Sequence, residues 1–131
     1  MSDHPIERWH RLVATRDRAG LGSWLAEDAV FHSPVVHTPQ AGRALVARYL
    51  AAAIEVLGNE SFRYVREIVV ATEAALEFEV VIDEVVVNGV DLIRWNEGGQ
   101  VIDFKVLIRP LKAVQLIHQR MGELLHFGDV A

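Results

Sequence analysis

The sequence contains no cysteine among its 131 residues. This absence excludes disulfide bonds, thiolate nucleophiles and cysteine-based zinc sites, and it suits a reducing compartment. Long apolar runs are also absent, since none reaches the roughly eighteen residues that cross a bilayer. The first ten residues, MSDHPIERWH, lack the hydrophobic segment of a secretion signal. We therefore expect a cytoplasmic protein with no membrane-spanning segment.

An excess of basic residues is missing as well. The chain has 13 Lys and Arg against 18 Asp and Glu, a formal charge of −5, and its basic residues are scattered. This balance repels phosphate backbones, so we expect no nucleic-acid partner. The glycines of NEGGQ join two strands and lack the following helix of a phosphate-binding loop. No metal-binding motif is present either, and we expect no metal and no cofactor.

What the sequence does have is enough apolar residues for one core. Hydrophobic residues make up 51% of the chain, and its length suits one domain and is short for two. No linker, repeat or low-complexity segment divides it. We therefore expect residues 1–131 to form a single globular domain.

Four segments have the pattern of helices. The first has Ser2 or Asp3 as its cap, Pro5 in its first turn and Gly20 as its stop. The other three are a short piece at 21–25, a helix at 41–57 and a last helix at 111–125, where apolar residues recur at a period near 3.6.

Strand patterns dominate the second half of the chain. β-branched and aromatic residues, separated by turn signals, predict strands at 29–34, 61–72, 75–83, 85–96 and 100–110. Within the fourth of these, Asn88 and Gly89 favour a bulge over a hairpin turn. Helices followed by successive strands indicate an α+β fold, with helices on one face of a curved antiparallel sheet.

One residue of the fourth strand conflicts with its neighbours. Alternation places Asp91 on the same face as Ile93 and Trp95, and places Leu92 and Arg94 on the other. An unpartnered carboxylate on an apolar face is costly, so Asp91 must be paired, protonated or beside water. Two interpretations stay open. Either Asp91 accepts structural hydrogen bonds, or it lies in a cavity where a raised pKa makes it a donor or a base.

Two stretches carry a family resemblance. WHRLVATRDRAGLGSWLAEDAVFHSPVVHTPQAGRALVARYL and GVDLIRWNEGGQVIDFKVL resemble the nuclear transport factor 2-like superfamily. That superfamily includes the ketosteroid isomerases and the SnoaL-like polyketide cyclases. The resemblance covers residues 5 to about 110 and implies a cystatin-like cone, in which a curved antiparallel sheet packs against three or four N-terminal and C-terminal helices. It also implies a homodimer through the sheet.

The resemblance further implies three site positions. Asp91 stands where the ketosteroid isomerases have an oxyanion-hole Asp, which an apolar site keeps protonated. Trp9 stands where they have an oxyanion-hole Tyr, and Ser33 where they have the catalytic base. Trp9 can only donate one hydrogen bond, and Ser33 is no base without a partner, so steroid isomerisation by that mechanism is not expected. The SnoaL-like cyclases are similar in relying on a pocket Asp as acid and base, which Asp91 alone can supply.

We therefore predict Asp91, Ser33 and Trp9 as catalytic residues. The predicted substrate-binding residues are Tyr49, Phe78, Ile93, Trp95, Phe104, Val106, Ile108 and His37. Tyr64 can offer a hydroxyl to the same interior, although the alternation around it is too irregular to assign its face. The roles of His32 and His37 stay open, including His37 as a base acting on Ser33.

These residues predict a small-molecule enzyme with an apolar pocket. Its reaction would be proton transfer next to a carbonyl, as in an isomerase, an aldol cyclase or a dehydratase, on a small apolar or weakly polar organic ligand. The alternative is a non-catalytic ligand-binding or dimerisation module of the same fold, which the missing base favours.

Overall fold

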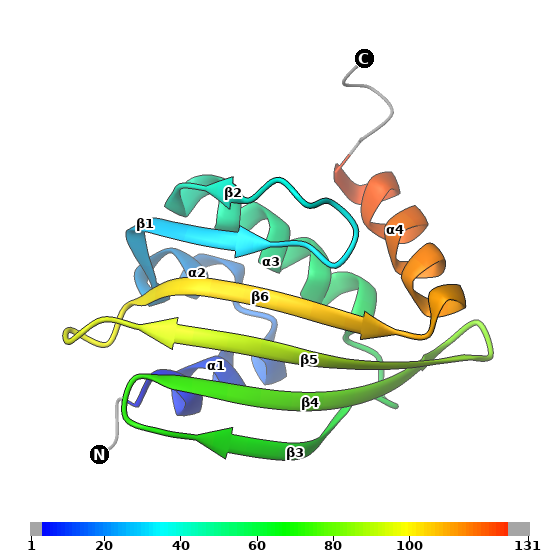
Figure 1. Cartoon of the computed structure of the whole chain (residues 1–131), viewed down its shortest axis with the longest axis horizontal. Coiled ribbons are helices and arrows are strands. Elements are labelled where there is room, and N and C mark those ends of the chain that lie inside the picture. The colour runs from blue at the N-terminus through cyan, green and yellow to red at the C-terminus, as the bar shows by residue number, and fades with distance from the viewer. Residues whose placement is uncertain (1–3, 126–131) are drawn as a thin grey trace.

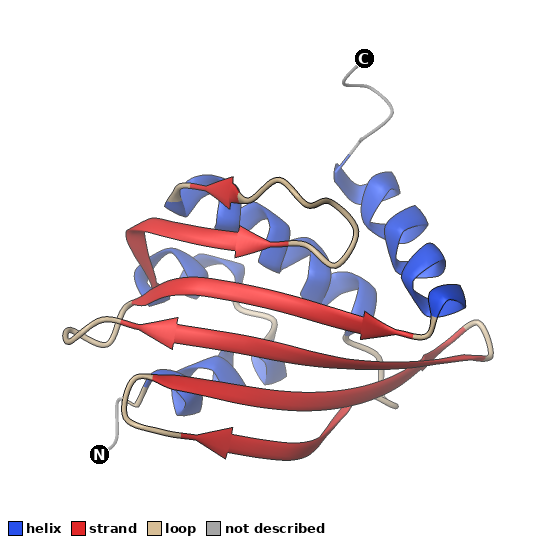
Figure 2. Ribbon diagram, in the orientation of Figure 1, coloured by secondary structure: helices blue, strands red, loops and turns tan. Residues whose placement is uncertain are grey.

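The computed structural model describes residues 4–125. Within them the chain forms four helices, α1 (Pro5–Thr15), α2 (Arg18–Trp24), α3 (Arg43–Leu57) and α4 (Leu111–Leu125). The strands are β1 (Leu25–His32), β2 (Gln40–Ala41), β3 (Arg63–Val69), β4 (Glu73–Ile82), β5 (Val85–Trp95) and β6 (Val101–Arg109). The α+β fold is confirmed (Figure 2).

The strands form one curved, open sheet in the order β2-β1-β6-β5-β4-β3 (Figure 1). Four of the five pairings are antiparallel, and β1 runs parallel to β6. Such a parallel pair needs a long connection, which α3 and the strands β3 to β5 supply between β1 and β6. The first three helices cover one face of this sheet, and α4 packs against β5, β6 and α3.

The first helix is shorter than the sequence predicts. Its N-cap is His4, whose Nδ1 accepts a hydrogen bond from the backbone N–H of Ile6 at 3.1 Å; the predicted caps, Ser2 and Asp3, lie outside the described residues. The helix does not continue to Gly20, because Arg16 adopts a left-handed conformation with φ of 54°. A new helix, α2, then begins after Asp17, whose carboxylate caps it.

The core lies between the helices and the inner face of the sheet. Its largest fully buried side chains include Trp24 and two phenylalanines of the sheet, Phe78 and Phe104. Trp9 stacks on Trp24 with ring centroids 4.8 Å apart, and the Trp24 indole N–H donates to the carbonyl of Pro5 at 2.9 Å. These contacts hold α1 and α2 together over the sheet.

Two local expectations for the strands are wrong. Asn88 and Gly89 form no bulge, because β5 stays in register with both β4 and β6 through these residues. The irregularity lies instead near the other end of β5, between Arg94 and Trp95. As a result Val101 is fully buried, whereas Ile102 is only half-buried, although strict alternation with the inward-facing Phe104 would place Ile102 in the core.

The described helices include none that is both long and apolar enough to cross a membrane.

Candidate functional site

A cavity of about 70 Å³ lies between the inner face of the sheet and three helices, α1, α3 and α4. Its walls are mainly apolar and aromatic. The lining residues are Trp9, Val13, Phe31, Ser33, Pro34, Val35, Tyr49, Leu50, Ala53, Ile54, Leu57, Gly58, Phe62, Tyr64, Phe78, Asp91, Phe104, Val106, Ile108, Ile117 and Met121. The loop after β1 and Gly58 at the end of α3 are half-exposed, so the cavity reaches the surface there.

Asp91 is the acidic residue of this lining. It lies on the inner face of β5, in register with Leu76 of β4 and Val106 of β6, and only 6% of its surface is exposed. Strand alternation therefore places this carboxyl group as the sequence predicts. In the described chain no lysine, arginine or histidine side chain lines the cavity. Burial without a cation raises the pKa of Asp91 from 3.8 to about 7.

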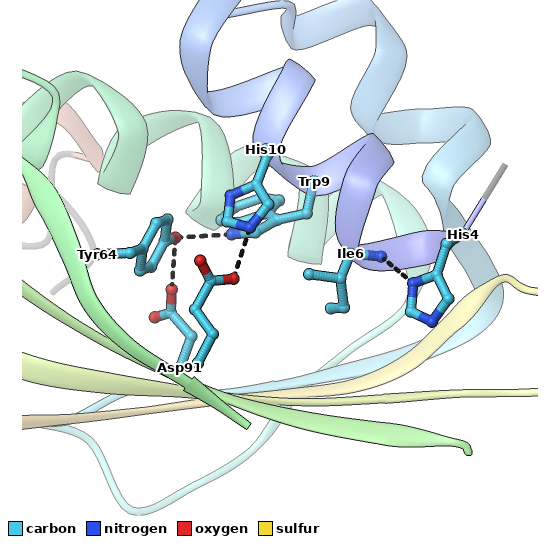
Figure 3. Close-up of polar contacts among 7 residues, drawn as sticks. His4, Ile6, Trp9, His10, Tyr64 and Asp91 are labelled. Carbon is cyan, nitrogen blue, oxygen red and sulfur yellow. Dashed lines mark hydrogen bonds and ion pairs between the residues drawn. The ribbon is translucent and has the colours of Figure 1, made fainter. Parts of the chain in front are cut away.

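Tyr64 gives Asp91 its hydrogen bond, as Figure 3 shows. The Tyr64 hydroxyl oxygen lies 3.1 Å from Asp91 Oδ2. The same hydroxyl accepts a hydrogen bond from the Trp9 indole N–H at 2.8 Å. We call Trp9, Tyr64 and Asp91 the polar trio. The hydrogen bond to Tyr64 partly opposes the effect of burial on the Asp91 pKa. Burial and the neighbouring Asp91 charge raise the pKa of Tyr64 well above its usual value.

The second carboxyl oxygen of Asp91 borders the cavity. Only Oδ2 has a hydrogen-bond partner among the described residues. No fully buried side-chain oxygen in the described part of the chain lacks a partner. Oδ1 must therefore have accessible surface, and the cavity is what Asp91 faces.

Tyr64 is the site residue whose orientation sequence reasoning could not assign. It lies on the edge strand β3, where the register with β4 shifts between Tyr64 and Arg66. The shift lets Tyr64 and Glu67 face the same side although they are three residues apart: Tyr64 pairs with Phe78, and Glu67 pairs with Leu76. The usual alternation therefore fails here. The sequence feature that could still have pointed to Tyr64 was its position as a single tyrosine in a strand of mixed polarity.

Ser33 lies at the cavity wall in the loop after β1. Its Oγ accepts hydrogen bonds from the backbone N–H groups of Val35 at 3.1 Å and Val36 at 3.4 Å. These bonds fix a local turn at the mouth of the cavity. No carboxylate or imidazole in the described chain hydrogen-bonds to Ser33, so nothing there activates it as a nucleophile or base.

The predicted substrate-binding residues fall into two groups in the structure. Tyr49, Phe78, Phe104, Val106 and Ile108 all line the cavity.

Ile93, Trp95 and His37 lie outside the lining. Ile93 and Trp95 point inward from β5, but they follow Asp91 by one and two inward positions and pack at the far end of the core. Trp95 there meets the ring of His4, with centroids 5.2 Å apart. His37 is exposed on the loop that precedes β2. Residues on the inner face of β5 therefore do not all line the cavity.

Two other histidines, His32 and His10, form pairs with carboxylates and do not belong to the cavity lining. His32 pairs with Asp103 of the neighbouring strand at 2.8 Å, and both side chains are about 30% exposed. His10 of α1 pairs with Glu67 of β3 at 2.7 Å and packs edge-on against the Tyr64 ring. No cluster of three metal-ligating side chains occurs among residues 4–125.

The fold and the cavity define a class before any comparison: an α+β cone that encloses one carboxyl group in apolar walls. Comparison with known families then identifies the chain. Residues 6–104 match the profile described as the SnoaL-like domain, and the protein belongs to this family.

Solved structures agree. A protein described as a steroid delta-isomerase from Pseudomonas aeruginosa is 36% identical, with 97% of this chain and 93% of that chain covered and a TM-score of 0.88. An uncharacterised protein with a cystatin-like fold from Silicibacter pomeroyi DSS-3 is 35% identical, with coverage of 95% and 87% and a TM-score of 0.86. A protein with a ketosteroid isomerase-like fold from Catenulispora acidiphila DSM 44928 is 14% identical, with coverage of 87% and 91% and a TM-score of 0.63. This last likeness concerns the fold alone.

Proposed function

We propose that the protein binds a small, uncharged, apolar or weakly polar organic molecule in the cavity and transfers a proton next to its carbonyl group, with Asp91 as acid and base. The observation that carries this proposal is the buried Asp91 carboxyl group, which borders an apolar cavity and has a pKa of about 7. A carboxyl group with such a pKa is present in both forms near neutral pH, as acid–base catalysis requires.

The chemistry needs only this group and its neighbours. The ionised Asp91 takes a proton from the carbon next to the carbonyl, and the electron pair moves onto the carbonyl oxygen as an enolate. The protonated Asp91 then returns the proton to a carbon of the same ligand, which completes an isomerisation. Apolar walls keep water from competing for the proton. One positioned acid–base group contributes a factor of roughly 10² to 10⁴ in rate.

The family supports isomerase-type chemistry, with one difference at the site. The Pseudomonas aeruginosa relative is described as a steroid delta-isomerase, whereas Ser33 stands at the position where the resemblance places the base of the ketosteroid isomerases. Because nothing in the described chain activates Ser33, we assign both proton-transfer steps to Asp91. Ser33 then contributes a wall and a turn at the cavity mouth.

The test compares Asp91→Asn with the native protein on cyclohex-3-en-1-one, a β,γ-unsaturated ketone whose conjugation can be followed by ultraviolet absorbance. Asn keeps the size of the side chain and cannot take up a proton from carbon. We expect turnover to fall by roughly 10² to 10⁴. The matched control is Asp28→Asn, which changes an exposed aspartate of β1 and should leave turnover unchanged.

The alternative is a binding module without chemistry, and one observation favours it: among the described lining residues Asp91 is the single carboxyl group. Under this alternative the native protein and Asp91→Asn would convert the ketone equally slowly, while native mass spectrometry would still detect a bound molecule in the cavity. Equal turnover of the two proteins would remove the catalytic proposal.

We also propose a homodimer that forms through the outer face of the sheet. Several large apolar side chains are exposed on this face, which the helices do not cover. They are Ile68, Val81, Val86, Leu92 and Leu107. An exposed apolar surface of this kind supports association with a second copy. A cytosolic location remains our prediction from the composition.

A further inference from the structure

The hydrogen bond between Trp9 and Tyr64, at one end of the polar trio, can run in one direction only. An indole N–H can donate a hydrogen bond but has no lone pair with which to accept one. The 2.8 Å contact between Trp9 Nε1 and the Tyr64 hydroxyl therefore always uses one lone pair of that oxygen. Because Trp9 cannot accept, the Tyr64 proton cannot turn back toward α1.

The Tyr64 proton then has two destinations, Asp91 or the cavity. When Asp91 is ionised, the hydroxyl donates to Asp91 Oδ2 across 3.1 Å. The trio then presents acceptor oxygens to the cavity and no donor. Its two hydrogen-bonding protons, the Trp9 N–H and the Tyr64 O–H, are both donated to other members of the trio.

Adding one proton to Asp91 changes this arrangement. If the proton lies on Oδ2, Asp91 donates to Tyr64, and the Tyr64 hydroxyl is released toward the cavity. If it lies on Oδ1, Tyr64 still donates to Oδ2, and the carboxyl O–H itself faces the cavity. Both arrangements leave one donor for a ligand.

We propose that the polar trio presents one hydrogen-bond donor to the cavity when Asp91 is protonated and none when it is ionised, so that Trp9 acts as a positioning residue and the proton on Asp91 selects the ligand. The protonated form selects a neutral ligand with an acceptor, such as a ketone. The ionised form favours a neutral ligand with a donor, such as an alcohol, and holds a ketone more weakly until proton transfer from the ketone to Asp91 supplies a donor for the enolate oxygen. The selection of ligands, which we call the ligand half of this inference, rests on the proposed function. The dependence of the donor on the Asp91 proton, which we call the hydrogen-bond half, does not.

Other ionisable groups near the trio are few and define the controls. On α1, His10 packs edge-on against the Tyr64 ring, and it pairs with Glu67 of β3. Tyr49 of α3 lines the cavity as well. The lining residues from β1, β4, β6 and α4 carry no ionisable side chain. Replacing Glu67 with Gln removes the ion pair with His10 and leaves all three residues of the trio in place. The variant therefore distinguishes an effect of this pair from an effect of the trio.

The first experiment follows indole N–H resonances by NMR in protein labelled with ¹⁵N-tryptophan, without ligand, on both sides of the Asp91 pKa of about 7. We expect the Trp9 resonance to shift with the midpoint of the Asp91 carboxyl carbon. Trp24, whose N–H donates to the backbone carbonyl of Pro5, is the internal control and should show no such midpoint. The shift should vanish in Asp91→Asn, shrink in Tyr64→Phe and persist in Glu67→Gln.

A Trp9 resonance that ignores the Asp91 titration would overturn the proposal. A titration that survives in Asp91→Asn, or disappears in Glu67→Gln, would do the same, because the signal would then come from the His10–Glu67 pair.

The second experiment measures binding of cyclohexanone and cyclohexanol, which share a ring and do not ionise in this range. The ratio of ketone to alcohol affinity should fall by roughly tenfold or more from below to above the Asp91 midpoint, the usual effect of one buried unpaired polar group. A constant ratio would overturn the ligand selection. If neither molecule binds, the ligand half and the proposed function are both contradicted, while the NMR titration still decides the hydrogen-bond half.

Discussion

Asp91 combines deep burial with a single hydrogen-bonding neighbour among residues 4–125, and this has consequences for stability as well as for chemistry. Its pKa in the folded protein is about 7, against an ordinary value of 3.8. Between these two values the folded state holds a proton that the unfolded state has released. The free energy of unfolding therefore falls as the pH rises through this window, and it is lowest, as far as Asp91 is concerned, once the group is ionised above pH 7.

This sign predicts that Asp91→Asn is more stable than the native protein in mild alkali. Each pKa unit corresponds to about 1.4 kcal/mol, so the difference approaches roughly 4 kcal/mol above the folded pKa and disappears near pH 4. Urea unfolding of both proteins at several pH values measures it. Asp28→Asn, at an exposed position, should show no such trend. A gain in stability for Asp91→Asn that is equal at every pH would contradict the buried-charge explanation.

Predictability at the residue scale depended on the regularity of each strand. Asp91 was placed correctly because β5 alternates without interruption around it. Tyr64 could not be placed, since the register shift in β3 depends on how β3 pairs with β4 and leaves no mark in the sequence of β3 alone. Trp9 was placed near the site by resemblance, but its actual partner, Tyr64, followed only from the three-dimensional arrangement.

At the scale of elements, Gly89 explains why β5 runs straight past Asn88. The Phe78 ring packs directly over Gly89, and a Cβ atom there would lie 2.4 Å from Phe78 Cζ and 2.8 Å from the carbonyl oxygen of Leu107. The glycine therefore serves close packing between strands, and the Asn-Gly turn signal is misleading here.

We predict that Gly89→Ala destabilises the protein by about 1–3 kcal/mol, because the added methyl group displaces an aromatic ring and a neighbouring strand. Denaturant unfolding measures the loss. Adding Phe78→Leu should restore part of it by relieving the contact with the ring, while the contact with the Leu107 backbone remains. If Gly89→Ala were as stable as the native protein, the close approach would not constrain this position.

Helix boundaries show the same limit of sequence reasoning. Periodicity predicts α4 with the bounds that the structure has, because its apolar stripe and the preceding proline agree. The break between α1 and α2 was predicted at Gly20, four residues too late. It occurs at Arg16, an ordinary helix-forming residue that takes a left-handed conformation, with Asp17 capping the next helix. Here tertiary packing overrides the local preference.

At the scale of the whole molecule, the outer face of the sheet carries both apolar side chains and ion pairs. Arg66 pairs with Glu77 at 2.8 Å and Arg63 with Glu79 at 3.0 Å, next to the exposed apolar side chains that support the proposed dimer. Leu107 is 52% exposed and pairs with Val90 in the middle of the sheet.

We predict that Leu107→Lys converts the proposed dimer into monomers with little loss of monomer stability, since a lysine there faces water in the monomer and is desolvated in the dimer. Sedimentation equilibrium measures the change. Leu124→Lys, at an exposed position on α4, is the matched control and should leave the assembly unchanged. A native protein that sediments as a monomer at every concentration would contradict the proposed dimer.

The α+β arrangement was predictable because the period of the apolar pattern changes from helical to alternating between the two halves of the chain. The cavity was not predictable from the pattern. Inward-facing residues of one strand end up partly in the cavity and partly in solid core, as Asp91 and Ile93 illustrate. Which ones border empty space depends on how α1, α3 and α4 lie over the sheet.

The members of the polar trio are far apart in the sequence. Trp9 and Tyr64 are 55 positions apart, and Tyr64 and Asp91 are 27 apart. They come from the first helix, an edge strand and an inner strand, so an opening that separates α1 from β3 removes a hydrogen bond and admits water to the carboxyl group. The acidity of Asp91 would then return toward that of an aspartate in water. An NMR signal of the Asp91 carboxyl carbon that titrates near neutrality therefore indicates that α1, β3 and β5 are packed together. Its loss would reveal partial opening, even where the secondary structure seen by circular dichroism is unchanged.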